Sequence, residues 1–487
     1  MAEIKQLGVD VKDELAATNK ERLFLALGWG VFLSINVYFL WGVPLPLLPN
    51  IDIATYDRLI DPFRWAASVS IAVTALVFAV ASLVKLFEAS QAKLILVVGA
   101  LLFLGGFFIY IWASAVSPMA YLFLMAGLLI GVSNGMFFLL WGEVFSSFDA
   151  ASVMYVLFFA GIISGSICLI LLFIKSVVAY IVLGMLLPVA IGTLWSALKT
   201  AYERQAKPFV ATTIKGLRAY PWRPLICVTM LGFVFNAMRE VSFVDFNGPA
   251  IINMFSLLGL IVVSFVVVGV MKVTGAKKPD IERLYSPIML IIAGCLIPVP
   301  FLDAQYRIVF IVLISCAYLF VVTLFKATCA NTSQESALHP FCVFGIGYTG
   351  VFGSVALGTW VGMVPREAGG ENSTIYIIGI VLVAIYLLAI PLVLMKRRRK
   401  SSVIVAMDED QLSFCCERLA RRHAITQSEQ AVMELLARNM SYASVAKELQ
   451  LSENTVRTHG KAIYRKLDVH SKQELVDLVT AEQTRGL

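Results

Sequence analysis

The sequence predicts an all-α protein in which a polytopic bundle of twelve transmembrane helices, arranged as six plus six, precedes a small C-terminal domain of four helices. Three observations predict it. Of 487 residues, 59% are hydrophobic and 15% charged, whereas soluble domains carry about 25% charged residues. Charged residues are sparse from Leu23 to Met395 and dense afterwards. The sparse region contains apolar runs of about 20 residues, the length a helix needs to cross a bilayer.

The apolar region divides into twelve candidate spans. In chain order they are Leu23–Val43, Trp65–Val84, Leu94–Ala113, Met119–Trp141, Ala151–Ile174, Val177–Ala197, Pro224–Val244, Pro249–Lys272, Ser286–Leu302, Tyr306–Phe325, Pro340–Val364 and Ile375–Met395. The longest internal loop, residues 199–223, is rich in Lys and Arg and separates the sixth span from the seventh. The domains are therefore predicted as a cytoplasmic N-terminus (1–22), a membrane domain (23–395), a linker (396–422) and a C-terminal domain (423–487).

The distribution of Lys and Arg predicts that both termini are cytoplasmic, because short inner loops of membrane proteins carry the excess of these residues. With that orientation most of them, Lys326 at the end of the tenth span included, lie in inner loops. The outer loops carry only Arg58, Arg64, Lys175, Arg307 and Arg366. The chain is thus expected to be a multi-pass protein of the inner (cytoplasmic) membrane. The basic run Lys396–Lys400 fits a topology determinant, with contact to lipid or DNA phosphates as the alternative.

Residue patterns for metal binding or catalysis are lacking. Six of the eight cysteines lie in apolar runs, and the sequence contains no Cys-x-x-Cys motif and no Cys/His ligand spacing. It also lacks a nucleophile elbow and a phosphate-binding loop. The sequence therefore predicts no metal site, no cofactor and no enzymatic activity.

Twelve spans in two sets of six, separated by a long basic loop, resemble the major facilitator fold. That resemblance implies a cavity between two pseudo-symmetric halves. One family feature is missing: the glycine-rich motif with Asp and Arg between spans two and three is replaced by Leu83–Ser90, which reads LVKLFEAS. This departure argues against transport.

The C-terminal region has the signals of four short helices. Thr426 and Glu429 form a capping box ahead of a first helix over 427–438, with Val432, Leu435 and Leu436 on its apolar face. A second helix is predicted over Tyr442–Leu449, a third over Glu453–Leu467 with Ser452 as N-cap, and a fourth over Lys472–Ala481. In the linker, a short amphipathic helix over Gln411–Arg422 is predicted to carry Phe414 and Leu419 on one side.

The third helix has one buried and one exposed face. Val456, Gly460, Ile463 and Leu467 recur at helical spacing and form the predicted buried stripe. The side chains on the opposite face are Arg457, Thr458, Lys461 and Arg465.

This region resembles the LuxR-type (GerE-like) helix-turn-helix domain from about Ile425 to Val479. The matching residues are Ile425-Thr426-x-x-Glu429, Val445-Ala446, Leu451-Ser452, Thr455-Val456-Arg457-x-His459, Ile463, Lys466-Leu467-x-Val469-x-Ser471 and the tail His470–Leu475. The resemblance implies a DNA-binding domain. Arg457, Thr458 and Lys461 would contact bases, Arg465 would lie on the same face, and Thr455 and Lys466 would lie nearer the phosphates. A helical adaptor that binds protein is the alternative.

Two positions depart from the family pattern, since Asn439 replaces a Gly and Gly460 replaces a Val. A glycine inside a helix costs about 1 kcal/mol relative to alanine, which predicts a domain of marginal stability. In the fourth helix, Leu475, Leu478 and Val479 would leave an apolar face exposed. That face predicts a homodimer on double-stranded DNA.

Ionisable and amide side chains inside the first, fourth and seventh spans predict a ligand site, because such groups are costly in a bilayer; tryptophans accompany them. The candidates are Asn36, Trp41, Asn134, Trp141, Asn236, Arg239 and Glu240. Arg239 would face an anionic or phenolic group of a small molecule. The alternative is that Arg239 and Glu240 lie near a span end or pair with other side chains.

Together these features predict a membrane-embedded one-component transcriptional regulator that senses a small molecule and binds promoter DNA. The alternative function is a secondary transporter with a regulatory DNA-binding tail. The expected partners are double-stranded DNA, the lipid bilayer and a small-molecule ligand.

Overall fold

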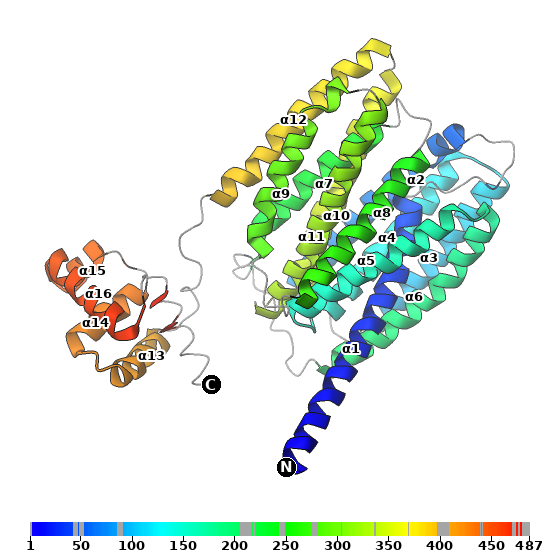
Figure 1. Ribbon diagram of the computed structural model, residues 1–487. Helices are drawn as coiled ribbons and strands as arrows, with labels where there is room; N and C mark the ends of the chain where they lie inside the picture. Colours follow the sequence, from blue (N-terminus) through cyan, green and yellow to red (C-terminus); the bar gives the residue numbers. More distant parts are fainter. Residues whose placement is uncertain are drawn as a thin grey trace. The chain divides into compact units, whose positions relative to one another are not determined.

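The computed structural model of the chain forms two compact units, Met1–Met395 and Lys396–Leu487. Figure 1 shows the helices of both, and each unit is considered by itself below. The structure describes residues 2–41, 47, 53–84, 91–204, 217, 220–242, 249–273, 281–302, 304–335, 338–368, 370–396, 409–438, 440, 442–469, 474–475 and 478–479.

The first unit contains all twelve helices that the sequence predicts. They are α1 (Ala2–Asn36, continued by the π-helix η1, Val37–Trp41), α2 (Ile53–Leu83), α3 (Ala92–Ala115), α4 (Ala120–Phe145), α5 (Ala150–Leu172), α6 (Ser176–Arg204), α7 (Trp222–Ser242), α8 (Pro249–Val273), α9 (Ile281–Leu296, followed by the 3₁₀-helix η4, Val299–Phe301), α10 (Ala304–Glu335), α11 (Pro340–Ala368) and α12 (Gly370–Lys396). The predicted fold class is confirmed.

Within the described residues, nine of these helices are long and apolar enough to cross a membrane. The helices α9 and α12 contribute the shorter apolar segments Pro287–Phe301 and Ile375–Ile390. The remaining helix, α7, carries Arg239 and Glu240 inside its apolar run. The unit is therefore a multi-pass membrane bundle.

Among the helices that extend beyond the predicted spans, α2 and α10 each carry a basic residue into the bundle. α2 begins at Ile53 and continues through Pro62, so Arg64, predicted in an outer loop, is only 4% exposed and pairs with Asp61 at 3.3 Å. α10 continues to Glu335. Lys326, predicted in an inner loop, therefore lies within the apolar segment Tyr306–Gln334. The predicted loop positions of Arg64 and Lys326 were wrong.

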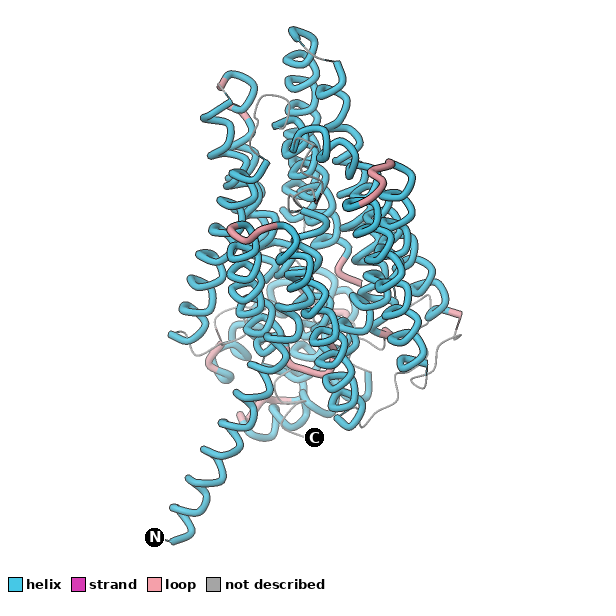
Figure 2. Tube along the Cα trace, turned by 90° about the vertical axis from the view of Figure 1, so that its right-hand side faces the viewer, coloured by secondary structure: helices cyan, strands magenta, loops and turns pink. Residues whose placement is uncertain are grey.

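The two halves of the bundle repeat the same packing. In the first half α1 packs on α5 and α2 on α4, and in the second half α7 packs on α11 and α8 on α10. The halves meet where α2 packs on α11 and α5 on α8. Figure 2 shows the helical trace turned by 90° from the view of Figure 1. Such a repeat places any central cavity between the halves.

A stripe of glycines lets α4 approach α2 closely. A Cβ atom added at Gly131 would lie 2.5 Å from the carbonyl oxygen of Ala67, and one added at Gly127 would lie 2.5 Å from that of Phe63. Because lipid provides little hydrophobic drive between helices, close backbone approach at small residues is a main source of their association.

The second unit is a small helical domain with its own core. Its helices are α13 (Glu409–Arg422), α14 (Gln427–Ala437), α15 (Tyr442–Glu448) and α16 (Glu453–Leu467), and residues 474–475 and 478–479 are also helical. The core consists of Leu412, Cys415, Cys416, Leu419, Ala420, Val432, Met433, Leu436, Ala437, Val445, Ala446, Val456, Ile463, Leu467, Val469, Leu475 and Val479. The predicted departure at Asn439 lies outside the described residues.

The helix predicted in the linker belongs to this core. α13 packs on α14 and buries Leu412, Cys416 and Leu419. Phe414, predicted on the same side as Leu419, is 58% exposed. The predicted pairing was wrong because 414 and 419 are five positions apart, which places them on different faces of a helix with 3.6 residues per turn.

The apolar face that suggested a dimer is mostly used inside the unit. Leu475 and Val479 are 0% and 1% exposed, and Leu478 is partly buried against the same core. The premise of an exposed face on the fourth helix was therefore wrong.

Candidate nucleic-acid interface and membrane cavity

The helix α16 begins and ends at defined caps. The Ser452 hydroxyl accepts a hydrogen bond from the Thr455 amide at 3.1 Å, and Asp468 ends the helix in the left-handed conformation with φ 53°. Val456, Gly460, Ile463 and Leu467 are its buried residues, as the sequence predicts. The apolar stripe thereby fixes which face of α16 meets solvent.

The exposed face of α16 is basic. Arg457, Thr458, Lys461 and Arg465 are all exposed. At 3.6 residues per turn, the three cations lie within an arc of about 80°. Asn454 is exposed on the same face and was missed by the sequence reasoning; its position four residues before Thr458 is the signal that identifies it. A row of cations beside amide and hydroxyl groups suits phosphate and base-edge contacts in a major groove.

Arg457 is held in place by two neighbours. Its guanidinium donates to the Glu453 carboxylate at 2.7 Å, and it lies 5.6 Å from the centre of the Tyr442 ring. Tyr442 belongs to α15, so this contact joins the two helices of the helix-turn-helix. The contacts restrict the conformations of the arginine before it meets a ligand.

Gly460 provides the space for the Tyr442 ring. A Cβ atom at position 460 would lie 2.9 Å from Cε1 of Tyr442. The Tyr442 hydroxyl donates to the Tyr464 hydroxyl at 3.3 Å, which fixes the ring over the glycine. The loss of helix propensity at Gly460 is thus offset by packing between α15 and α16.

We expect Gly460→Val to lower the free energy of unfolding of residues 396–487 by about 1–2 kcal/mol, the usual cost of overpacking. The valine displaces the Tyr442 ring and removes its contact with Arg457. Chemical denaturation measures the effect. In a Tyr442→Ala background the same substitution should cost little, and an equal loss in both backgrounds would contradict the coupling.

The Lys466 side chain, predicted near the DNA phosphates, forms hydrogen bonds within the domain. Its ammonium donates to Glu429 at 2.6 Å and to the Ala424 carbonyl at 3.0 Å. Glu429 also accepts from the Thr426 amide at 2.8 Å and completes the predicted capping box. The Lys466 ammonium and the Thr426 amide lower the pKa of Glu429 from 4.5 to about 2. This cluster, the Glu429 clamp, ties α14 to the end of α16.

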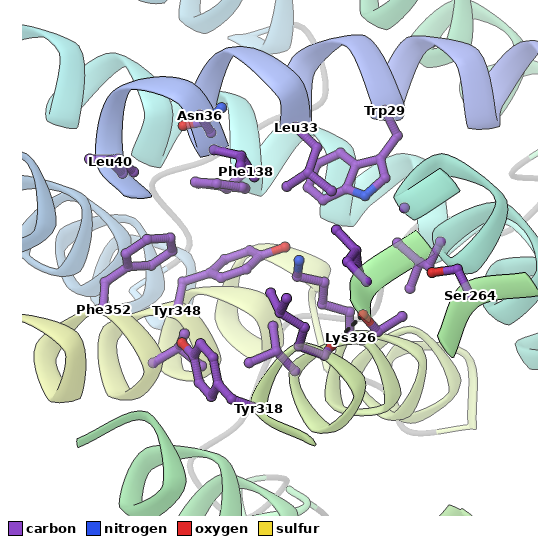
Figure 3. A pocket seen from close by; sticks show the side chains of 18 residues that line it. Trp29, Leu33, Asn36, Leu40, Phe138, Ser264, Tyr318, Lys326, Tyr348 and Phe352 are labelled. Atoms are coloured by element: carbon purple, nitrogen blue, oxygen red, sulfur yellow. Dashed lines mark hydrogen bonds between the residues drawn. The ribbon is translucent and has the colours of Figure 1, made fainter. Parts of the chain in front are cut away.

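In the membrane unit, a cavity lies between the two halves of the bundle. Its lining includes Trp29 and Asn36 of α1, Phe138 of α4, Ser264 of α8, Tyr318 and Lys326 of α10, and Tyr348 and Phe352 of α11. Figure 3 shows these side chains around the space. The volume of the cavity that the centre of a water-sized sphere can reach is about 80 Å³. One water molecule needs about 10–15 Å³ of this volume. The cavity therefore has room for a small molecule.

Lys326 is the charged residue of this lining. Its ammonium lies 5.0 Å from the centre of the Trp29 ring, a contact worth about 2 kcal/mol when desolvated. Placing a lysine at the centre of a membrane helix costs about 2.5–3.5 kcal/mol. The ring therefore offsets only part of that cost.

Several polar atoms at the cavity have no hydrogen-bond partner among the described residues. They are Oδ1 of Asn36, Oγ of Ser264 and the hydroxyl of Tyr348, on side chains that are 4%, 0% and 4% exposed. The amide nitrogen of Asn36 donates to the Phe32 carbonyl at 2.9 Å. Buried polar groups are normally paired, so these atoms are available to a ligand.

The structure brings one of the predicted ligand residues to the cavity. Asn36 lines it, whereas the side chain of Trp41 lies outside the described part. Five others are buried but are not among its lining residues: Asn134, Trp141, Asn236, Arg239 and Glu240. Lys326 was missed as a site residue; a single lysine within a long apolar run is the signal for it.

The polar residues of α7 lie where α7 packs on α11. A Cβ atom added at Gly358 of α11 would lie 3.1 Å from Cβ of Asn236, and one added at Gly362 would lie 2.6 Å from Cβ of Glu240. Asn236 donates to the Gly232 carbonyl of its own helix at 2.8 Å. These residues thus contribute to packing within the second half of the bundle.

Among the described residues, no group of three or more His, Cys, Asp or Glu side chains is placed to hold a metal ion.

Residues 423–479 match the family described as bacterial regulatory proteins, luxR family. The chain is also 37% identical over 71 residues to the uncharacterized response regulatory protein YgeK of Escherichia coli (strain K12). That similarity covers 14% of this chain and 48% of YgeK, so the chain spans about half the length of this relative. The C-terminal unit thus contains a LuxR-type helix-turn-helix domain, and α13 precedes the matched residues.

The membrane unit is similar to transporter structures. A bacterial homologue of the iron transporter ferroportin in an outward-facing state matches with a TM-score of 0.50 and 12% identity over 77% of this chain and 99% of that one. The fucose:proton symporter of E. coli matches with a TM-score of 0.47 and 12% identity over 79% of this chain and 100% of that one. The ferroportin homologue shares the fold, which is major-facilitator-like.

Proposed function

We propose that this chain is a membrane-embedded one-component transcriptional regulator. A small molecule binds in the cavity of the membrane unit, and the LuxR-type domain of the same chain then changes its occupancy of promoter DNA. The observation that carries the proposal is the presence, in one polypeptide, of a DNA-binding domain and a membrane bundle with a cavity between its halves. The Lys and Arg distribution supports cytoplasmic termini, on the side of the membrane where DNA is.

The lining of the cavity supports a conformational response. α1 and α4 belong to the first half of the bundle, whereas α8, α10 and α11 belong to the second. A ligand that prefers one arrangement of the halves shifts the equilibrium between them by its difference in affinity.

Contacts along α10 support the same mechanism. Lys326 lines the cavity, and two turns further on Gln334 donates to the carbonyls of Ser146, at 3.1 Å, and Phe148 beyond the end of α4. Gln334 thus bridges the halves at one end of the bundle. Displacement of α10 by a ligand would alter this bridge.

Transcripts are first compared between the deletion strain and the complemented strain, each with and without candidate small molecules. This comparison identifies the target promoter and an active small molecule. A reporter gene under that promoter then tests the proposal in the deletion strain. We expect Val322→Phe, which fills the cavity, to remove the response to that molecule. The matched control is Val309→Phe on the same helix, because Val309 is 57% exposed on the outside of the bundle.

Both variants must reach the membrane at the wild-type level for the comparison to count. A normal response from Val322→Phe would place the sensing site elsewhere. A response that needs no membrane unit at all would contradict the proposal.

A second candidate function is secondary transport with a regulatory tail. The shared transporter fold and the cavity between the halves favour it. Uptake of the active small molecule into proteoliposomes distinguishes the two, since a regulator needs binding but no net flux.

A further inference from the structure

The ammonium group of Lys326 is the chemically distinctive feature of the membrane cavity. α10 carries it into a lining that is otherwise aromatic, aliphatic or neutral and polar. Figure 3 shows the Lys326 amine pointing toward the side of the cavity where the Tyr348 hydroxyl lies, with Trp29 above it. The lysine therefore faces the empty space rather than lipid.

No acidic side chain is found among the residues that line the cavity. Lys326 likewise takes part in none of the ion pairs that join two described residues, such as those of Arg64 with Asp61 and of Lys466 with Glu429. A cation at membrane depth requires a partner or a water-filled cavity. The Trp29 ring supplies part of that partnership, and an anion in the cavity would complete it.

One hydroxyl group can add a donor for the same anion. The hydroxyl oxygen of Tyr348 is buried and has no hydrogen-bond partner among the described residues, and Figure 3 shows it on the side of the cavity toward which the Lys326 amine points. A hydroxyl donates to a carboxylate as readily as it accepts. Charge-assisted bonds from lysine and hydroxyl groups to a carboxylate are stronger than neutral ones.

The remaining lining favours an apolar body attached to that anionic group. Leu33, Phe138, Val322 and Phe352 surround the space, and aromatic rings pack well against such a surface. A bare inorganic anion would leave these side chains against water. The size of the cavity limits the body to one ring or a short branched chain.

We propose that the cavity binds a small organic monoanion, a carboxylate on an aromatic or branched apolar body, with its charged group on Lys326. The inference rests on the proposed function for the existence of a ligand and adds its chemical class. The carboxylate contacts the Lys326 ammonium and the Tyr348 hydroxyl. The apolar body packs against the aromatic lining.

Binding to the purified full-length protein in lipid nanodiscs tests this class directly. The probes are benzoate, phenylacetate and 3-phenylpropionate, each compared with its neutral amide by isothermal titration calorimetry. We expect at least one carboxylate to bind ten times or more tightly than its amide. The inference is overturned when no carboxylate in the series binds more tightly than its amide.

Variants locate the anion contact. Lys326→Met should bring the affinities of carboxylate and amide within about twofold, whereas Lys326→Arg, which keeps the charge, should preserve most of the preference. Lys93→Met is the matched control, because the Lys93 ammonium lies 5.6 Å from the Trp195 ring but outside the cavity. An unchanged preference in Lys326→Met contradicts the assignment.

One further variant keeps the test decisive should Lys326→Met fail to fold. Tyr348→Phe removes only a hydroxyl group and should weaken carboxylate binding severalfold and amide binding by less, because the bond from the hydroxyl to the charged carboxylate is the stronger one. Equal weakening of both probes would contradict the proposed contacts.

The outcome is separable from that of the regulatory proposal. Carboxylate binding without any change in reporter expression would contradict the proposed regulatory function but support the proposed ligand class. A reporter that responds to a neutral compound, together with no preference for carboxylates in the binding assay, would contradict the ligand class but support the regulatory function.

Discussion

Replacing Arg457 and Lys461 by alanine should abolish operator-specific binding by residues 396–487 while leaving their fold intact. Both side chains lie on the exposed basic face of α16, opposite the buried stripe that holds the helix in the domain. A good base contact contributes about 1–3 kcal/mol, which corresponds to a loss of roughly 5- to 150-fold in affinity for each side chain. The double variant should therefore bind the operator no better than unrelated DNA.

Gel-shift titration against the operator at fixed salt measures this loss. Arg421→Ala is the matched control, because Arg421 is also an exposed helical arginine paired four residues back, with Glu417, but belongs to α13. Wild-type affinity in the double variant would remove α16 from the interface. A loss of the same size in Arg421→Ala would point to general charge attraction instead.

Glu429→Ala should produce the largest loss of stability in the C-terminal unit, about 2–4 kcal/mol. The substitution removes the return arm of the capping box, worth about 1 kcal/mol, and leaves Lys466 without its charged partner, worth about 1.5–3 kcal/mol. Glu429→Gln should lose less, since glutamine serves in a capping box. Chemical denaturation of residues 396–487 measures both variants.

The same clamp predicts a pH dependence with a definite sign. The pKa of Glu429 is lowered from 4.5 to about 2 in the folded unit, so the folded state prefers the ionised carboxylate. Its contribution is fully present above pH 4.5 and is lost as the pH falls toward 2. The stability gap between wild type and Glu429→Gln should narrow over that window. The exposed Glu448 provides a control, Glu448→Gln, and a gap that stays constant between pH 6 and about pH 2 would rule out the clamp.

The C-terminal unit could be predicted closely because each signal there is local. The Thr426 capping box, the Ser452 N-cap and the stripe from Val456 to Leu467 depend on residues within one or two turns of each other. α13 was harder, since the helix was predicted but not its contact with α14. Its buried residues, such as Cys416, can be assigned only once the neighbouring helix is in place.

The membrane helices were predictable as helices but not in their orientation. A span that is apolar all round has no amphipathic face, so nothing local shows whether Asn236 or Glu240 points toward the cavity or toward α11. Lys326 was predicted in a loop because it is the first charged residue after the apolar run of the tenth span, whereas α10 continues to Glu335. The facing of a side chain in such a bundle depends on contacts between spans distant in the sequence.

The packing of Tyr442 over Gly460 carries a consequence for related sequences. The two positions lie on different helices, yet the ring occupies the volume that a larger side chain at 460 would need. Selection acting on one position should therefore depend on the residue at the other. Relatives with valine at the position of Gly460 should have a smaller or differently shaped residue at that of Tyr442. Over evolutionary time the two positions should be replaced together, and a phylogeny of such chains should record paired changes on the same branches.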